Sequence, residues 1–416
     1  MKTIYAFFLL LLQMLPANAQ FITVRDGRFF DGDKEYRYVG MNFWYGAILA
    51  SEGRGGDRAR LKRELDLMQK TGINNLRVLV GGDGREGLAS HIEPVLQTSP
   101  GVYNDTLLVG LDYLMNEFEK RGMKAILYFN NAWEWSGGYG TYLEWTTGKK
   151  CPIPSVDGWP SYMDYVSDFV LNDEAIKLSL NHIRNIVTRK NSITGKPYKE
   201  SSALMAWEVA NEPRCFVNDS LHKAKLVDFI DKSSRLIKNL DPNHLVTTGS
   251  EGKHGCEYDL DLFTKIHTVP CIDYCCVHIW PYNWSWIRDK KDSINALTQA
   301  YIEEAYELMR PYGRPVVLEE FGYPRDEMKF AAGTPTSERD AYFKYVFGII
   351  RDSGKIAGCN IWGWGGTADV KHLMWQRWDD YVGDPAQEEQ GLNSIFAKDK
   401  STLKLIRQFA RQLKKQ

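Results

Sequence analysis

Eight short apolar runs, separated by longer amphipathic segments, recur along this chain of 416 residues. Each run is almost continuously apolar, as expected for strands that are buried on both faces of a parallel sheet. The predicted strands cover residues 36–45, 74–82, 124–133, 203–212, 245–250, 274–282, 315–322 and 356–365. Eight strands, each followed by a helix or a long crossover, favour an α/β fold. The count and the length fit a closed (β/α)8 TIM barrel better than an open doubly wound sheet.

The segments between the strands follow a helical period. In residues 107–121, for example, Leu107, Leu111, Leu114 and Phe118 share one face. Helices are predicted for residues 58–71, 107–121, 162–189, 222–240, 293–309, 338–352 and 401–413. Glycines follow several of these helices, which is typical of helix C-termini.

The N-terminal part of the mature chain predicts a β-hairpin. Residues 21–36 carry Asp-Gly turn signals at 26–27 and 31–32. We expect this hairpin to close the bottom of the barrel. Two other segments, 133–162 and 365–394, are long loops, which in a TIM barrel rise over the C-terminal ends of the strands, where active sites lie. No linker or internal repeat divides residues 20–416, so one domain is predicted.

The first 19 residues have the pattern of a secretory signal peptide. A Lys near the start precedes an apolar run from Ile4 to Leu12, and Ala17 and Ala19 form an A-x-A cleavage pattern. The apolar run is too short to cross a bilayer comfortably. We therefore expect cleavage near Ala19 and a secreted or periplasmic chain with no membrane partner after the signal is removed.

Composition and cysteine pattern exclude several classes of function. The formal net charge is −1, which gives no electrostatic reason to expect nucleic acid as a partner. Seven Cys leave at least one unpaired, and Cys275, Cys276 and Cys359 lie in strand-like runs as expected for buried free thiols. Neither paired C-x-x-C motifs nor H-E-x-x-H occur, so no metal or cofactor is expected.

Polar residues stand at or near the ends of the predicted strands. In a closed barrel these ends converge on one opening. Two glutamates on separate strands, Glu212 and Glu320, would then face each other. The other candidates for this opening are Arg77, Asn131, Trp133, Asn211, His278, Trp280, Tyr282, Trp362 and Trp364.

Two facing carboxyl groups suit glycoside hydrolysis. One carboxylic acid protonates the leaving oxygen while the other supports the developing positive charge on the sugar. Sugar rings present apolar C–H faces that stack on aromatics. We therefore expect three or four of seven tryptophans to form sugar subsites: Trp133, Trp135, Trp280, Trp362, Trp364, Trp375 and Trp378. A carbohydrate-binding protein with an inactive barrel and a metal-dependent hydrolase remain alternatives.

The stretches AWEVANEPR (residues 206–214) and VVLEEFG (316–322) resemble glycoside hydrolase family 5, a (β/α)8 family of retaining enzymes. The resemblance implies that Glu212 is the acid/base and Glu320 the nucleophile. It also implies site roles for Arg77, Asn211, His278 and Trp362. Glu319 is expected to point away from Glu320, because side chains alternate along a strand.

Further motifs are most similar to the endo-β-1,4-mannanase branch of that family. They are GMNFWYGA, NNAWEWSGG, NIWGWGG and YVGDPAQEEQGLNSIF. One departure is Trp280, where many relatives have Tyr; Tyr282 is a candidate to replace that hydrogen bond to the nucleophile.

The resemblance implies a retaining endo-β-1,4-mannanase that acts on β-mannan polysaccharide or oligosaccharide as a monomer. A β-1,4-glucanase or an exo-acting β-mannanase of the same family remains the alternative.

Overall fold

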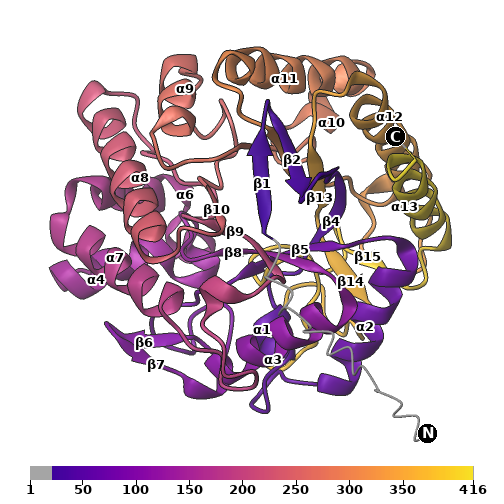
Figure 1. Cartoon of the computed structure of the whole chain (residues 1–416). Helices are drawn as coiled ribbons and strands as arrows, with labels where there is room; N and C mark the ends of the chain where they lie inside the picture. Colours follow the sequence, from indigo (N-terminus) through magenta and orange to yellow (C-terminus); the bar gives the residue numbers. More distant parts are fainter. Residues whose placement is uncertain (1–20, 416) are drawn as a thin grey trace, which may run out of the picture.

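The computed structural model describes residues 21–415, and its centre is an eight-stranded parallel sheet. The strand order is β10-β9-β8-β5-β4-β13-β12-β11, which places strands that are consecutive along the chain side by side. Figure 1 shows these strands inside a ring of helices. The strands are β4 (Tyr38–Asn42), β5 (Asn75–Leu79), β8 (Lys124–Tyr128), β9 (Leu204–Glu208), β10 (Leu245–Thr247), β11 (Cys275–Ile279), β12 (Val316–Phe321) and β13 (Gly358–Ile361).

Main-chain hydrogen bonds also link the first and last strands of this order. The N–H of Asp273 donates to the carbonyl of Val246 at 2.8 Å, and the N–H of His278 donates to that of Glu251 at 3.1 Å. The sheet is thus nearly closed into a barrel, and the predicted (β/α)8 fold is confirmed. All eight predicted strands are present, and each is shorter than the apolar run that predicted it.

One long helix follows each barrel strand before the next begins. These are α2 (Arg58–Thr71), α3 (Asp105–Arg121), α7 (Asp173–Val187), α8 (Ser220–Leu240), α9 (Leu260–Thr268), α11 (Ile294–Met309), α12 (Ser337–Ser353) and α13 (Lys400–Leu413). The sequence did not predict α9. The single helix predicted for 162–189 was wrong, because the chain breaks there into α6 (Trp159–Ser167), a 3-10 turn and α7. The side chain of Asn172 caps α7 by accepting from Ala175 N–H.

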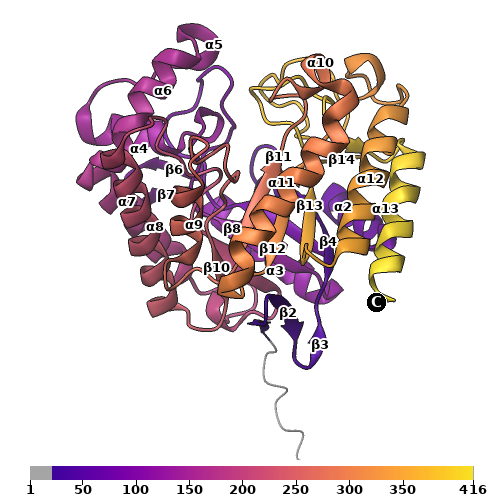
Figure 2. The same cartoon turned by 90° about the horizontal axis from the view of Figure 1, so that it is seen from above.

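A three-stranded antiparallel sheet covers the bottom of the barrel. It consists of β1 (Ile22–Arg25), β2 (Arg28–Asp31) and β3 (Lys34–Glu35), so the predicted hairpin is confirmed. Ile22 and Phe29 are buried in a cluster with barrel residues such as Ile126. Figure 2 shows β2 and β3 at the end of the barrel opposite α10 (Trp286–Asp289).

The opposite end of the barrel carries the long loops. The loop after β8 folds into α4 (Gly138–Thr147), α5 (Pro154–Asp157) and α6, and the loop after β13 contains β14 (Trp364–Gly366) and ends at β15 (Ile395–Phe396). In Figure 2, α5, α6 and α10 stand at this end. Within residues 21–415, none of the helices combines the length and the apolar character that a membrane span needs. The predicted signal peptide, residues 1–19, lies outside the described residues.

The seven cysteines all lie in the described part of the chain, and each is a free thiol there. Cys275, Cys276 and Cys359 are buried, which confirms the prediction for these three.

Candidate active site

A cavity of about 590 Å³ opens among the long loops at the C-terminal ends of the strands. Six tryptophans form much of its wall: Trp133, Trp135, Trp159, Trp280, Trp284 and Trp362. Polar groups in the lining include Asn211, Glu212, Arg214, Glu251, Glu320, Gln387 and Glu388. Aromatic faces combined with a few polar groups are typical of a sugar-binding cavity.

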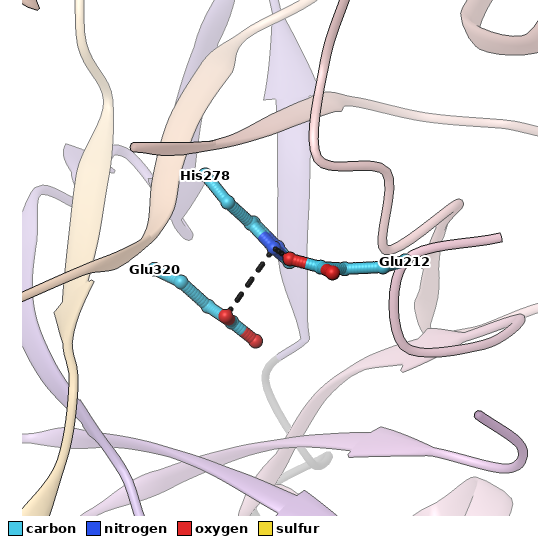
Figure 3. A group of neighbouring side chains, drawn as sticks. All are labelled: Glu212, His278 and Glu320. Atoms are coloured by element: carbon cyan, nitrogen blue, oxygen red, sulfur yellow. Dashed lines mark hydrogen bonds and ion pairs between the residues drawn. The ribbon is translucent and has the colours of Figure 1, made fainter. Parts of the chain in front are cut away.

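The two predicted carboxyl groups meet in this cavity. Glu212 follows β9, and Glu320 lies near the end of β12. His278 of β11 stands between them, with Nδ1 at 2.7 Å from Oε1 of Glu212 and 3.3 Å from Oε2 of Glu320 (Figure 3). One oxygen of each carboxyl group and one imidazole nitrogen lie within 4.8 Å of one another. This spacing suits a retaining pair, which needs about 5–5.5 Å, and is too short for an inverting pair.

The backbone holds Glu212 in a conformation that is rare for residues with side chains. Its φ is 49°, in the left-handed region, and such a residue carries a strain of about 1–3 kcal/mol. The N–H of Glu212 donates to the carbonyl of Gly249 at 2.9 Å, which fixes the turn that follows β9. This turn aims the carboxyl group of Glu212 toward β11 and β12.

Arg77 of β5 lies beneath Glu320 and is fully buried. Its guanidinium donates to Oε1 of Glu320 and, in a bidentate arrangement, to both oxygens of Glu208. It also donates to the amide oxygens of Asn42 (3.0 Å) and Asn211 (2.8 Å). A guanidinium bound in this way favours the ionised form of Glu320 and fixes its orientation.

Arg77 distinguishes the two carboxyl groups. Burial raises the pKa of both Glu212 and Glu320, more strongly that of Glu320, whose ionisation the charge of Glu212 also disfavours. The charge of Arg77 lowers the pKa of Glu320 by direct contact, whereas the pKa of Glu212 is lowered chiefly by the indole N–H of Trp133. Among the described residues Arg77 donates to Glu320 and to no oxygen of Glu212, so this contact assigns the negative charge to Glu320 and the proton to Glu212. The site then offers one acid and one base. The ion pair with Arg77 and the bond to His278 hold these groups in place.

Several predicted residues lie below the cavity and do not line it. Arg77, Asn131 and His278 are fully buried. Asn131 accepts from the side chain of Asn211 at 3.0 Å, so it positions a neighbour of Glu212. Of the predicted contact residues, Trp133, Asn211, Trp280 and Trp362 do line the cavity, as does Trp135.

Two of the predicted contact residues lie elsewhere, and these interpretations need correction. Trp364 is completely buried behind the site, where its indole N–H donates to Glu64 at 2.9 Å. Tyr282 is half-buried outside the cavity, and among the described residues the polar contacts of Glu320 are with Arg77 and His278. The hydrogen bond from Tyr282 to Glu320 is therefore not made. The predicted strand 274–282 ends earlier, at Ile279, and the chain turns after Trp280, so Tyr282 lies outside β11.

Glu319 also differs from the expectation. It was expected to point away from Glu320, yet it is fully buried and lies 3.8 Å from Nε of Arg77 and 3.6 Å from Nε2 of His278. The reason is a register shift: Val277 pairs with Leu318, but His278 pairs with Glu320, so Glu319 has no partner on β11. An irregularity of this kind re-aims a side chain.

Glu251 and Arg214 are two further polar residues of the cavity that were not among the predicted site residues. Glu251 accepts from the indole N–H of Trp284 at 2.9 Å and pairs with Arg214 at 3.4 Å. Burial and the nearby Glu212 raise the pKa of Glu251 to about 8. Arg214 lines the cavity and also pairs with this loop carboxylate. Glu251 directly follows the predicted strand 245–250. The placement of polar residues at the ends of predicted strands therefore also indicates Glu251.

Comparisons with known proteins agree with this geometry. A family model described as "GH family 5 beta-mannosidase-like" matches residues 19–416. The crystal structure of a glycoside hydrolase family 5 mannosidase from Rhizomucor miehei is 30% identical and superposes with a TM-score of 0.87, over 96% of this chain and 99% of that one. Mannan endo-1,4-beta-mannosidase 7 of Arabidopsis thaliana is 28% identical, over 96% of this chain and 86% of that protein. An endo-beta-1,4-mannanase from Thermotoga petrophila, 24% identical over 92% of this chain and 78% of that one, shares the fold with a TM-score of 0.71.

Proposed function

The chain belongs to glycoside hydrolase family 5, and from this premise we propose that it is a retaining endo-β-1,4-mannanase. It hydrolyses internal β-1,4-mannosidic bonds of mannan, glucomannan or galactomannan. The observation that carries the proposal is the close approach of Glu212 and Glu320 across one cavity. Of these two carboxyl groups, Arg77 binds only that of Glu320. This arrangement supplies a proton donor and an anionic nucleophile within reach of a single glycosidic bond.

In the first step, a carboxylate oxygen of Glu320 attacks the anomeric carbon of the sugar. The bond from that carbon to the leaving oxygen breaks, and Glu212 transfers its proton to this oxygen. The products are a glycosyl ester on Glu320, a shortened chain with a free hydroxyl group, and an ionised Glu212. The N–H of His278 at 2.7 Å is placed to stabilise the new charge on Glu212.

In the second step, ionised Glu212 removes a proton from water, and the oxygen attacks the anomeric carbon of the ester. The ester bond breaks, Glu320 regains its charge in contact with Arg77, and the sugar leaves with its original anomeric configuration. Two inversions at the same carbon give net retention. Neither step requires a metal ion or a cofactor.

The assignment of the substrate is supported by the relatives and by the cavity walls. The Arabidopsis and rice relatives are named mannan endo-1,4-beta-mannosidases, and the Rhizomucor miehei mannosidase was crystallised with mannosyl-fructose. Trp280 and Trp362 meet edge to face, with ring centroids 5.6 Å apart. Both line the cavity beside Glu320 and are placed to stack on a sugar ring.

The test is hydrolysis of mannan, glucomannan and carboxymethyl-cellulose, with NMR of the first product formed. We expect activity on the two mannose-containing polymers and a β-anomer as first product. Glu320→Ala should abolish turnover and leave sugar binding intact. Unchanged hydrolysis by Glu320→Ala, or an α-anomer as first product, would rule out this assignment of residues.

Exo-acting hydrolysis is the second candidate function. Two contacts favour it, because each joins two different loops around the cavity. The side-chain N–H of Asn283, after β11, donates to Glu388 at 3.5 Å. The side-chain amide of Gln387 is placed to donate to both oxygens of Glu134, after β8, at 2.5 and 3.0 Å. Contacts of this kind restrict how far a polymer extends beyond the reacting bond. Product analysis on mannohexaose separates the candidates: mannose alone at early times indicates exo action, and a mixture of shorter oligosaccharides indicates endo action.

We further propose that the chain is exported and that residues 20–416 form a single catalytic domain. The support is the signal-peptide pattern of residues 1–19 and the absence of a linker sequence after them. N-terminal sequencing of the protein recovered outside the cytoplasm should begin at Gln20. A retained Met1 would contradict export by this signal.

A further inference from the structure

Below the cavity lies a buried carboxyl group that the mechanism above does not use. We propose that Glu319 is a positioning residue: it keeps a proton that points toward Nε2 of His278, and so holds the imidazole in the tautomer whose Nδ1–H faces Glu212 and Glu320. The functional consequence rests on the proposed retaining mechanism, whereas the tautomer itself does not.

The position of Glu319 follows from the register shift in β12. Because Glu319 has no partner residue on β11, its side chain enters the barrel interior together with that of Glu320. It is fully buried there. Its Oε2 atom lies 3.6 Å from Nε2 of His278, and neither Nε2 nor either oxygen of Glu319 has a hydrogen-bond partner among the described atoms. An approach of about 0.6 Å would turn this contact into an ordinary hydrogen bond.

The two nitrogens of His278 face different environments, which fixes where its proton must be. Burial lowers the pKa of His278 to about 4, so the ring is neutral near neutral pH and carries one N–H. Nδ1 faces an oxygen of Glu212 at 2.7 Å and one of Glu320 at 3.3 Å. An Nδ1–H can donate to the ionised Glu320 and to the carbonyl oxygen of the protonated carboxyl group of Glu212, whereas an Nδ1 lone pair would face the charge of Glu320. Nε2 is then an acceptor, and a lone pair facing an ionised Glu319 would be repulsive, whereas a protonated Glu319 can donate to it.

The charge balance of the buried cluster supports a neutral Glu319. Arg77 already donates to Glu208 through Nε and Nη2 and to Glu320 through Nη1. Glu319, 3.8 Å from Nε of Arg77, receives no hydrogen bond from it. A buried carboxylate without hydrogen bonds is strongly disfavoured, and burial together with the charge of Glu208 raises the pKa of Glu319.

The other titratable groups that face Glu319 do not supply a compensating positive charge. Apart from Arg77, His278, Glu208 and Glu320, these groups are phenols and thiols on or beside neighbouring strands: Tyr38, Tyr128, Tyr274, Cys275 and Cys276. Burial raises the pKa of each of these five phenols and thiols above its ordinary value, so they stay neutral around a neutral Glu319.

The fixed tautomer serves both steps of the reaction. After Glu212 has given up its proton, its carboxylate needs a donor, and Nδ1–H of His278 at 2.7 Å provides one. If the ring adopted the other tautomer, the Nδ1 lone pair would face this new charge and oppose it. Glu319 keeps its proton throughout the cycle, so it acts through His278 and not on the sugar.

The test compares Glu319→Gln with Glu319→Leu. Glutamine keeps an N–H donor toward Nε2, whereas leucine has a similar volume without a donor. In 15N-histidine-labelled protein, the signals of His278 are identified by their loss in His278→Gln. We expect an Nδ1–H tautomer in the unaltered protein and in Glu319→Gln, and an Nε2–H population in Glu319→Leu.

The kcat of each variant should depend on which tautomer of His278 it contains. Glu319→Gln should retain most of kcat, whereas Glu319→Leu should lose about 10- to 100-fold in kcat with a smaller change in KM, the loss expected for a hydrogen bond to a charged group. An Nε2–H tautomer in the unaltered protein would overturn the proposal, as would a Glu319→Gln variant as slow as Glu319→Leu. If Glu319→Leu does not fold, the tautomer of His278 in the unaltered protein and in Glu319→Gln still tests the proposal. The NMR readout needs no substrate, so a wrong polysaccharide assignment would leave its result unaffected.

Discussion

The indole N–H of Trp133 donates to Oε2 of Glu212, which links a wall of the cavity to the carboxyl group that we assign as acid/base. The two residues lie in the loops after neighbouring strands, β8 and β9. Trp133 also packs edge to face against Trp159, with ring centroids 5.6 Å apart. A residue placed to contact sugar therefore also adjusts the acidity of the group that protonates the leaving oxygen.

Replacing this indole should shift the pH profile. The hydrogen bond from Trp133 lowers the pKa of Glu212, so Trp133→Phe should raise that pKa by about one unit. Since Glu212 must be protonated for the first step, the alkaline limb of kcat/KM should move to higher pH. Trp159→Phe is the matched control, because it changes the same aromatic wall without touching Glu212. An alkaline limb that stays in place in Trp133→Phe would contradict the role of the indole.

Removing the acid should have an effect that depends on the leaving group. Glu212→Ala should lower kcat on mannan by about 10²- to 10⁴-fold, the usual contribution of a general acid/base. An aryl mannoside with a good leaving group needs no protonation, so its first step should be far less affected. Azide should then restore turnover by replacing water, with a β-mannosyl azide as product. Equal losses on both substrates, without rescue by azide, would count against Glu212 as the acid/base.

Asp83 should make the stability of the fold depend on pH. It is fully buried near the end of β5, and burial raises its pKa to about 7. Between about pH 4 and pH 7 the folded state therefore binds more protons than the unfolded state, so the contribution of Asp83 to stability falls as pH rises and levels off above pH 7. Relative to the unaltered protein, Asp83→Asn should gain about 4 kcal/mol of unfolding free energy across this range.

Urea unfolding at several pH values measures this difference. The control is Asp33→Asn, because Asp33 lies on an exposed turn of the N-terminal sheet. Because the side chain of Asp33 is fully exposed, this control measures how the loss of a surface carboxylate changes the unfolding free energy. A difference between Asp83→Asn and the unaltered protein that stays constant with pH would mean that Asp83 is ionised in the fold throughout this range.

The barrel and the carboxyl pair could be predicted because both follow from a local pattern. A strand buried on both faces must be apolar over its length, so a polar residue such as Glu212 marks the point where the strand reaches the opening. The family resemblance added roles for Glu212 and Glu320, and both lie in the cavity. Glu251 fits the same pattern, because it directly follows the predicted strand 245–250 and lines the cavity.

Other features depend on contacts between distant segments, which a local pattern does not contain. Glu319 enters the barrel because the register of β11 against β12 shifts by one residue. The position of Trp364 depends on Glu64, which lies 300 residues away along the chain. Gln387 and Glu388 reach the cavity because the loop after β13 folds back over the barrel. No periodicity in the sequence signals these three arrangements.

The contact between Asn283 and Glu388 should limit access of long chains to the site. It joins the loop after β11 to the loop after β13 at the lining of the cavity, with the amide of Asn283 donating at 3.5 Å. Asn283→Ala removes this contact but leaves Glu212, Glu320 and Arg77 untouched. Because the barrier lies outside the reacting groups, kcat/KM for mannan should rise relative to that for mannotriose, with little change on mannotriose itself. The nearby Ser285→Ala, which lines the same cavity without contacting Glu388, is the control for a general loosening of the loop. An unchanged ratio of kcat/KM in Asn283→Ala would mean that polymer already passes this contact freely, and equal gains in both variants would mean that loop mobility, not this hydrogen bond, limits access.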